Sequence, residues 1–139
     1  IDYELTQHLF DEKTVNHEDD PINVAKNIAF GKADSLKTLQ KYNDKFVLGV
    51  DTIVAFNNEI FGKPKDATEA ETIIRKLSGQ THQVISGISL INREKNISIT
   101  KAAISNVTFD KLSENFIKYY LIYFCQFFIK IKLLIYQFK

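Results

Sequence analysis

The apolar positions of this chain follow two kinds of pattern. Continuous or alternating apolar runs predict strands, whereas apolar residues that recur every three or four positions predict helices. Residues 46–56 are almost uninterrupted apolar sequence and predict a central buried strand. Asn57 and Asn58 then predict a tight turn into a short return strand at residues 60–61. Further strands are predicted at residues 1–6, 83–91 and 97–109.

A first helix is predicted to begin at Pro21 and to run to about Tyr42. Asp20 supplies a capping side chain, and proline is favoured at the first helical position. Apolar residues at helical spacing follow, and they predict one buried stripe. Lys32 lies within this stripe, where a core residue is expected.

A second helix is predicted to begin after Asp66. Glu69 follows three residues later and completes a capping box, and Gly79 ends the helix. Ser113 is placed to cap a last helix. Because strands and helices alternate, we expect an α/β (α+β) fold, built on a twisted mixed sheet that helices flank.

The composition bounds the class of protein. A chain of 139 residues, 45% of them hydrophobic, is long enough for one domain with a real core. The formal net charge of +1 gives no overall field for nucleic acid or an anionic membrane, so neither is expected as a partner. A single cysteine, Cys125, excludes an internal disulfide framework. With no secretory signal visible, we expect a cytoplasmic protein that lacks residues upstream.

The last residues have an unusual composition. Residues 116–139 consist of Phe, Ile, Lys, Tyr and Leu, apart from Cys125 and two glutamines. The longest uncharged run, residues 119–129, has eleven residues, which is fewer than the roughly 20 that span a bilayer. We expect a core at residues 1–121 and an atypical apolar aromatic tail at residues 122–139. The tail is interpreted either as a buried helix or as the product of a frame shift.

Four charged residues interrupt or border apolar elements. Asp51 lies inside the central strand, where an unpaired carboxylate is costly, so it is either paired with nearby groups or functional. Lys32 either extends past the edge of the core or contacts a ligand. Lys63 is a candidate phosphate ligand, because Gly62 before it permits a close approach of backbone and Pro64 after it fixes the chain. Glu12, together with Asp11, would supply oxygens for a hard cation such as Mg²⁺, although a solvated acidic turn is the favoured explanation of this pair when it is taken alone.

Together these residues suggest a chemistry. Lysines suit phosphate oxygens, and carboxylates suit a divalent metal or the activation of a water molecule. That combination predicts metal-assisted cleavage of a phosphoanhydride.

The segment "VLGVDTIVAFNNEIFGKPKDATEAETIIRKLSGQTHQVISGISLI" resembles the middle of the Maf family of septum-formation-inhibitor-like nucleoside triphosphate pyrophosphatases. The family motifs are an Asp-Thr strand, Gly-Lys-Pro, a helix that ends in Leu-Ser-Gly, and Thr-His-x-Val-x-Ser/Thr-Gly. All four occur here in order, and "FDEKTVNHEDDP" and "AFGKA" resemble the preceding family segments. The resemblance extends over about residues 1–121.

The resemblance implies a fold and an activity. Maf proteins are similar in fold to inosine triphosphate pyrophosphatases, and they hydrolyse a nucleoside triphosphate to the monophosphate and pyrophosphate with a divalent metal, Mg²⁺ or Mn²⁺. By the same resemblance Asp51 is the catalytic carboxylate, which activates water or holds the metal, and Glu12 is a second metal-side carboxylate. Lys32 and Lys63 are implied to contact phosphate, and Thr52 is given a weaker role in substrate binding. A homodimer is also implied.

The chain departs from the family pattern at both ends. The opening Ser-x-Ser-Pro-Arg-Arg motif and the downstream Gln-Gly segment have no counterpart here, and the fold is expected to be incomplete. Without paired arginines, triphosphate binding should weaken. Two interpretations therefore stay open, an active pyrophosphatase and a truncated, non-catalytic remnant that binds nucleotide or a protein partner.

Overall fold

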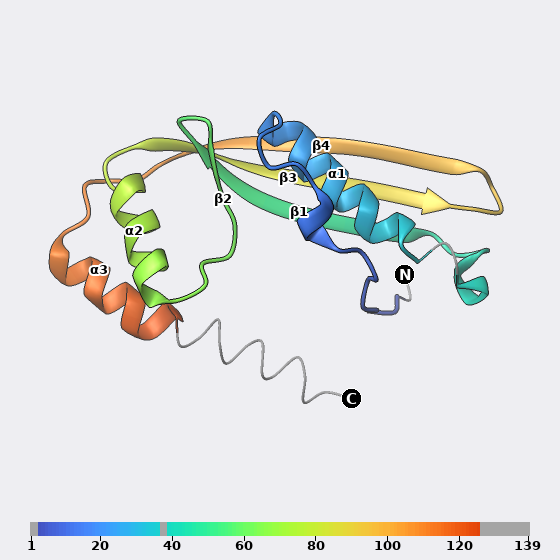
Figure 1. Cartoon of the computed structure of the whole chain (residues 1–139), viewed down its shortest axis with the longest axis horizontal. Coiled ribbons are helices and arrows are strands. Elements are labelled where there is room, and N and C mark those ends of the chain that lie inside the picture. Colours follow the sequence, from blue (N-terminus) through green and yellow to red (C-terminus); the bar gives the residue numbers. More distant parts are fainter. Residues whose placement is uncertain (1–2, 37–38, 126–139) are drawn as a thin grey trace. The chain divides into compact units, whose positions relative to one another are not determined.

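The computed structural model describes residues 3–36 and 39–125 (Figure 1). Within them the main elements are a four-stranded sheet and three α-helices, so the expected α/β class is confirmed. The strands are β1 (Val47–Phe56), β2 (Glu59–Phe61), β3 (Thr81–Asn92) and β4 (Ile97–Thr108). The helices are α1 (Pro21–Asp34), α2 (Ala67–Leu77) and α3 (Glu114–Tyr120).

The sheet has the strand order β2-β1-β3-β4. Asn57 and Asn58 both adopt positive φ, at 51° and 63°, and this is the conformation that a two-residue turn between β1 and β2 requires. Strands β1 and β3 are antiparallel. The described strands form an antiparallel sheet, so the mixed pairing that we expected does not occur within these residues.

The described residues divide into two compact units. The described residues of the first lie within Ile1–Ile60 and Gln83–Ser105, and those of the second lie within Phe61–His82 and Asn106–Lys139. The first unit holds α1, β1 and the main hydrophobic cluster, and the second holds α2 and α3. The expected division into a core at residues 1–121 and a tail stays a prediction.

Helix α1 begins as predicted and ends earlier. The backbone N–H of Asn23 donates to Asp20 Oδ2 at 3.3 Å, which confirms the cap. The helix was expected to continue to Tyr42, but it ends at Asp34, where the hydroxyl of Ser35 turns back to donate to the carbonyl oxygen of Lys32 at 2.8 Å. A serine that bonds its own backbone in this way competes with the continuation of a helix.

Helix α1 packs on one face of β1 and β3 at two glycines (Figure 1). A Cβ atom at Gly49 would lie 2.2 Å from the carbonyl oxygen of Ala29, and one at Gly87 would lie 2.1 Å from that of Ala25. No side chain fits between the helix and the sheet at these points, so only glycine allows this approach. The core cluster beside them is Val24, Ala25, Ile28, Ile53, Ala55 and Ile85.

The opposite face of the sheet carries apolar side chains that are exposed. Leu48 and Val50 of β1 and Ile88 of β3 are the clearest examples. The apolar run was interpreted as a fully buried strand, but only alternate residues of β1 face the core. Because successive side chains of a strand point to opposite faces, one covering helix buries only half of such a run.

The first described residues do not form the strand predicted at residues 1–6. The alternation of apolar and polar positions was misleading, because Tyr3 and Leu5 are both exposed. The segment is instead fixed by side-chain contacts, in which the hydroxyl of Tyr42 lies 3.2 Å from Glu4 Oε1 and 3.0 Å from Thr6 Oγ1.

Helix α2 is capped as the sequence predicts. The N–H of Glu69 donates to Asp66 Oδ1 at 2.8 Å, and Glu69 Oε2 accepts from the N–H of Lys65 at 2.6 Å. The reciprocal bond of the box therefore reaches one residue further back than the usual pattern. Gly79, with φ at 73°, follows the helix as the expected left-handed residue.

Helix α3 is joined to α2 by one arginine. Ser113 caps α3 as predicted, with its hydroxyl accepting from the N–H of Phe116 at 3.2 Å. Arg75 of α2 contacts both carboxylate oxygens of Glu114 at 2.6 Å, and it also holds Glu71 on its own helix.

The chain continues from α3 into a short π-helical segment, Leu121–Cys125. Ile122 and Tyr123 in it are exposed. Most of the aromatic tail, residues 126–139, lies outside the described residues, so both interpretations of it stay predictions. Among the described residues, no helix has the length and apolar character needed to cross a membrane.

His82 is buried and serves the packing of the second unit. Its ring meets Phe109 edge-on at 4.7 Å, and Nδ1 makes no hydrogen bond within the described part of the chain. Burial lowers the pKa of His82 below its ordinary value.

We expect Gly87→Ala to lower the free energy of unfolding by about 3 kcal/mol, because the new methyl group meets helix backbone that cannot move aside. Urea unfolding followed by circular dichroism measures this change. Gly62→Ala is the matched control, because no described atom lies within 4 Å of its Cβ position, and it should change stability by less than about 0.5 kcal/mol. Equal effects of the two substitutions would contradict the close packing.

We expect the protein to lose stability as the pH falls below about 6.5, the ordinary pKa of histidine. The pKa of His82 is lower in the folded state than in the unfolded chain, so the unfolded chain takes up the proton first as the pH falls. The contribution of neutral His82 to stability is therefore complete above the pKa of this residue in the unfolded chain. It is lost as the pH falls through the pKa of His82 in the folded protein. Urea midpoints between pH 7.5 and pH 4.5 measure this loss.

His82→Leu should flatten the midpoint profile, whereas His17→Gln, at an exposed position, should leave it unchanged. A profile that stays equally steep in His82→Leu would show that His82 is not the group responsible.

Candidate functional site

Three of the predicted site residues meet in the first compact unit. The ammonium of Lys32 lies 2.6 Å from Asp51 Oδ1 and 3.0 Å from Glu12 Oε1. The Lys32 and Asp51 side chains are only 14% and 15% exposed, whereas that of Glu12 is 44% exposed. These residues come from helix α1, strand β1 and a short 3-10 helix, and we call them the carboxylate–lysine cluster.

Asp51 belongs to the cluster because of its position in β1. It lies on the same face of the strand as Gly49 and Ile53, which is the face that α1 covers. Its partner on β3 is Gly87, which has no side chain. The backbone of α1 lies where a side chain at Gly87 would be, so the helix comes close to the strand that carries Asp51.

Lys32 reaches Asp51 from the last turn of α1. The buried residues Ile28, Ala29 and Ala33 share its helix face and pack on the sheet. An aliphatic stem can follow such an apolar surface while the ammonium meets the carboxylates. Lys32 therefore extends out of the core stripe to two carboxylates of the chain, and its contact with a ligand stays a prediction.

Glu12 is held near the helix by its neighbours in the loop. The Phe10 ring lies against Gly31, where a Cβ atom would meet it at 2.4 Å, and Leu9 N–H donates to Ser35 Oγ at 3.1 Å. Glu12 itself is the first residue of a short 3-10 helix, η1 (Glu12–Thr14).

Asp11 caps η1 through the N–H of Lys13, which donates to Asp11 Oδ1 at 3.1 Å. The sequence grouped Asp11 with Glu12 as a source of oxygens for a metal. Within the described residues only Glu12 of this pair joins the cluster, because Asp11 is used as a cap.

The two carboxylates change the acid–base properties of Lys32. Burial alone would lower its pKa, but the hydrogen bonds and negative charges of Asp51 and Glu12 outweigh burial and raise the pKa above its ordinary value. Lys32 therefore stays charged at neutral pH, which makes it suitable as a ligand for phosphate.

His8 is a neighbour of the cluster that the sequence did not single out. Its Nε2 lies 3.7 Å from Glu12 Oε1, the same oxygen that Lys32 contacts. Its Nδ1 is buried and makes no hydrogen bond to any described residue. The spacing of four residues between His8 and Glu12 was the available signal, but it is typical of helices, and no helix was predicted there.

Thr52 points away from the cluster. It follows Asp51 in β1 and therefore faces the other side of the sheet. Its Oγ1 lies 2.9 Å from the Oγ of Ser86, its partner on β3. The structure does not bring Thr52 to the cluster, and its role in substrate binding stays a prediction.

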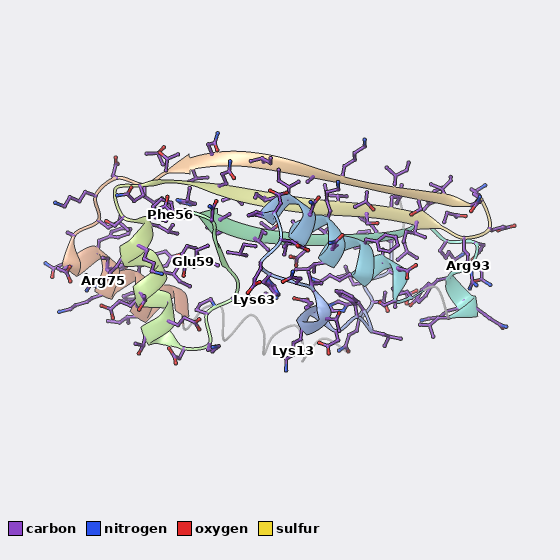
Figure 2. The ribbon with its side chains drawn as sticks, turned by 45° about the horizontal axis from the view of Figure 1, so that its top comes forward. Lys13, Phe56, Glu59, Lys63, Arg75 and Arg93 are labelled. Atoms are coloured by element: carbon purple, nitrogen blue, oxygen red, sulfur yellow. The ribbon has the colours of Figure 1, made fainter. Side chains whose placement is uncertain are left out.

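Lys63 lies in the loop between β2 and α2, as Figure 2 shows. It is exposed and belongs to the second compact unit, so its approach to Asp51 stays a prediction. Gly62 before it was expected to permit a close approach of backbone. Open space surrounds Gly62 among the described residues, so any close approach there would be that of a ligand.

The oxygen donors of the cluster fit a divalent metal that arrives with a phosphate ligand. Among the residues that the structure describes, no three acidic, histidine or cysteine side chains are grouped to hold a metal ion by themselves. Mg²⁺ is usually bound by one or two carboxylates together with substrate phosphates. Glu12 and Asp51 provide that number of carboxylates, and the Lys32 ammonium already lies between them as a cation.

A pocket of about 580 Å³ lies along the neighbouring side of α1. Its lining includes Phe10 and Phe30 and the acidic residues Asp11 and Asp34, and no lysine or arginine. Phosphate groups need positive charge, so this pocket does not suit them. The carboxylate–lysine cluster is the better candidate for phosphate chemistry.

Comparisons with known proteins identify the family of this chain. The model of the Maf family, described as Maf-like protein, matches residues 1–124. The dTTP/UTP pyrophosphatase of Clostridium novyi (strain NT) is 38% identical over 120 residues, which cover 86% of this chain and 62% of that protein. The dTTP/UTP pyrophosphatase of Clostridioides difficile (strain 630) is 38% identical over 121 residues, which cover 87% of this chain and 61% of that protein.

A third relative, the dTTP/UTP pyrophosphatase of Clostridium botulinum (strain Kyoto / Type A2), is 37% identical over 113 residues, 81% of this chain and 58% of that protein. The chain thus spans about three fifths of the length of these relatives. Because the family match extends over nearly the whole sequence and includes every residue of the cluster, the chain belongs to the Maf family.

Proposed function

We propose that this protein is a nucleoside triphosphate pyrophosphatase that hydrolyses its substrate to the nucleoside monophosphate and pyrophosphate with a divalent metal. The observation that carries the proposal is the carboxylate–lysine cluster, in which Lys32 lies within 3.0 Å of both Asp51 and Glu12. The names of the relatives support a pyrimidine substrate, dTTP or UTP.

Each residue of the cluster has a defined task in this reaction. A water molecule attacks phosphorus, the phosphoanhydride bond breaks, and pyrophosphate leaves with the bonding electrons. Asp51 accepts the proton of the attacking water or orients it, and Lys32 balances the negative charge of the phosphates. A divalent metal, when bound by Glu12 and Asp51, supplies Lewis acidity at the phosphate oxygens.

Two further residues complete the proposed site. Lys63 contacts the phosphates from the loop after β2, and Thr52 contributes to substrate binding. We propose Mg²⁺ as the metal, since hard oxygen donors prefer it, with Mn²⁺ as a substitute. A cytoplasmic location follows from the substrate, because nucleoside triphosphates are cytoplasmic metabolites, and a homodimer is proposed on family resemblance alone.

The alternative of a non-catalytic remnant receives less support. The three residues of the cluster are already assembled, and the relatives are named as pyrophosphatases. The two possibilities are separated by assaying dTTP, UTP and other nucleoside triphosphates for released pyrophosphate, with and without Mg²⁺. Nucleotide binding without metal-dependent release of pyrophosphate would favour the remnant.

We expect Asp51→Asn to lower kcat by about a hundredfold or more, because it removes the charge that accepts a proton or holds the metal. The substitution is nearly isosteric, so the fold should persist, as circular dichroism would show. Asp44→Asn is the control, since Asp44 is an exposed carboxylate paired with Lys45, and it should leave kcat unchanged. Unchanged turnover in Asp51→Asn would exclude a catalytic role for Asp51.

We expect Lys63→Ala to raise KM about tenfold and to change kcat less, because a phosphate contact by a charged donor is lost. Steady-state kinetics with dTTP measure both constants. Lys65→Ala, two residues away in the same loop, is the matched control and should behave as the unmodified protein. Equal KM values for Lys63→Ala and the unmodified protein would remove Lys63 from the site.

A further inference from the structure

The ammonium of Lys32 lies where a cation shared by the two carboxylates would lie. It is 2.6 Å from Asp51 Oδ1 and 3.0 Å from Glu12 Oε1, so a single charge touches oxygens from two different elements. A divalent ion that bridged these carboxylates would contact oxygens at about 2.0–2.6 Å, depending on the metal. Lys32 and such an ion therefore compete for the same oxygens.

Moving the Lys32 ammonium away from the two carboxylates costs free energy when the ammonium gains no other anionic partner. The Asp51 carboxylate is only 15% exposed, and a lysine that leaves it must give up an ion pair that solvent screens poorly. A metal ion that stays beside the ammonium meets repulsion between like charges instead. His8, whose Nε2 lies 3.7 Å from Glu12, adds no negative charge that could offset this repulsion. In both cases, a metal ion without nucleotide binds weakly to Glu12 and Asp51.

A triphosphate removes the obstacle. Its oxygens offer Lys32 another anionic partner, and the long side chain can turn toward them. The metal then arrives with much of its charge already balanced by the phosphates. Binding of the metal and of the nucleotide should therefore strengthen each other by the same factor.

We infer that Lys32 is an internal cation that excludes free divalent metal from Glu12 and Asp51, so that the ligand the site accepts is the metal–nucleotide complex. The second half of this inference rests on the proposed function, and the first half does not. Lys32 thus has two successive partners, the carboxylates before the nucleotide binds and the phosphates afterwards.

Mn²⁺ alone tests the first half. Electron paramagnetic resonance measures free Mn²⁺ during a titration of the unmodified protein, Lys32→Met and Lys26→Met. Lys32→Met should bind Mn²⁺ more tightly, on the order of tenfold, because the competing charge is gone. Lys26→Met, from the same helix, removes equal charge and should match the unmodified protein. Equal affinities in all three proteins would overturn the inference.

A conservative variant covers the case in which Lys32→Met does not fold. Lys32→Arg keeps the positive charge and should still exclude Mn²⁺, whereas Glu12→Gln should weaken any Mn²⁺ binding that remains. Tight binding of Mn²⁺ by the unmodified protein, comparable to its binding with nucleotide, would overturn the inference without any variant.

The second half is tested with the non-hydrolysable α,β-imido analogue of dUTP. It should tighten Mn²⁺ binding by the unmodified protein about tenfold or more, and this gain should shrink in Lys32→Met. If Lys32→Met binds Mn²⁺ alone more tightly but the analogue has no effect on any variant, the internal cation stands and the proposed function fails. If the analogue tightens Mn²⁺ binding by Lys32→Met as much as by the unmodified protein, Lys32 does not move from the carboxylates to the phosphates, and this part of the inference is overturned.

Discussion

The site depends on how closely α1 approaches the sheet. At Gly49 and Gly87 the helix backbone lies where a side chain would otherwise be, and this contact sets the position of every residue on the last turns of the helix. Lys32 reaches Asp51 only because of that approach. The same helix holds Phe10 against Gly31 and thereby places the loop that carries Glu12. Backbone packing, which involves no functional group, therefore decides which charges meet.

The carboxylate of Asp51 inside the sheet is stabilised by a neighbouring residue, Lys32. Asp51 would be strongly destabilising if it faced the core without a partner, and its ion pair with Lys32 removes that problem. Replacing a pair of this kind by apolar residues would often leave a protein as stable or more so. The retention of charge at this place is therefore better explained by the proposed chemistry than by a requirement of folding.

Much of the fold follows from local signals in the sequence. The caps at Asp20 and Asp66 and the asparagine turn at residues 57–58 depend on short-range hydrogen bonds and backbone angles, and these predictions are confirmed. The strand predicted at residues 1–6 is wrong over the described residues 3–6, because alternation alone does not provide a partner strand. The early end of α1 depends on a single serine hydroxyl, which the apolar periodicity could not reveal.

The residues of the candidate site could be predicted from the sequence, but the contacts between them could not. Asp51, Lys32 and Glu12 were chosen because they interrupt patterns or match family motifs, and they do meet. Their pairing could not be predicted, since it depends on the register that places Gly87 opposite Asp51. Nor did the sequence indicate that Asp11 caps η1 while its neighbour joins the cluster.

Asp51 and Thr52 are joined by one peptide bond and point to opposite faces of β1. One side chain is paired with Lys32 beneath the helix, and the other is hydrogen-bonded to Ser86 on the far face. A shift of the β1 register by one residue would exchange the two faces, because successive side chains of a strand point to opposite sides. The hydroxyl would then lie beneath the helix and the carboxylate on the far face, so the pairing of β1 with β3 decides which of the two chemistries the helix covers.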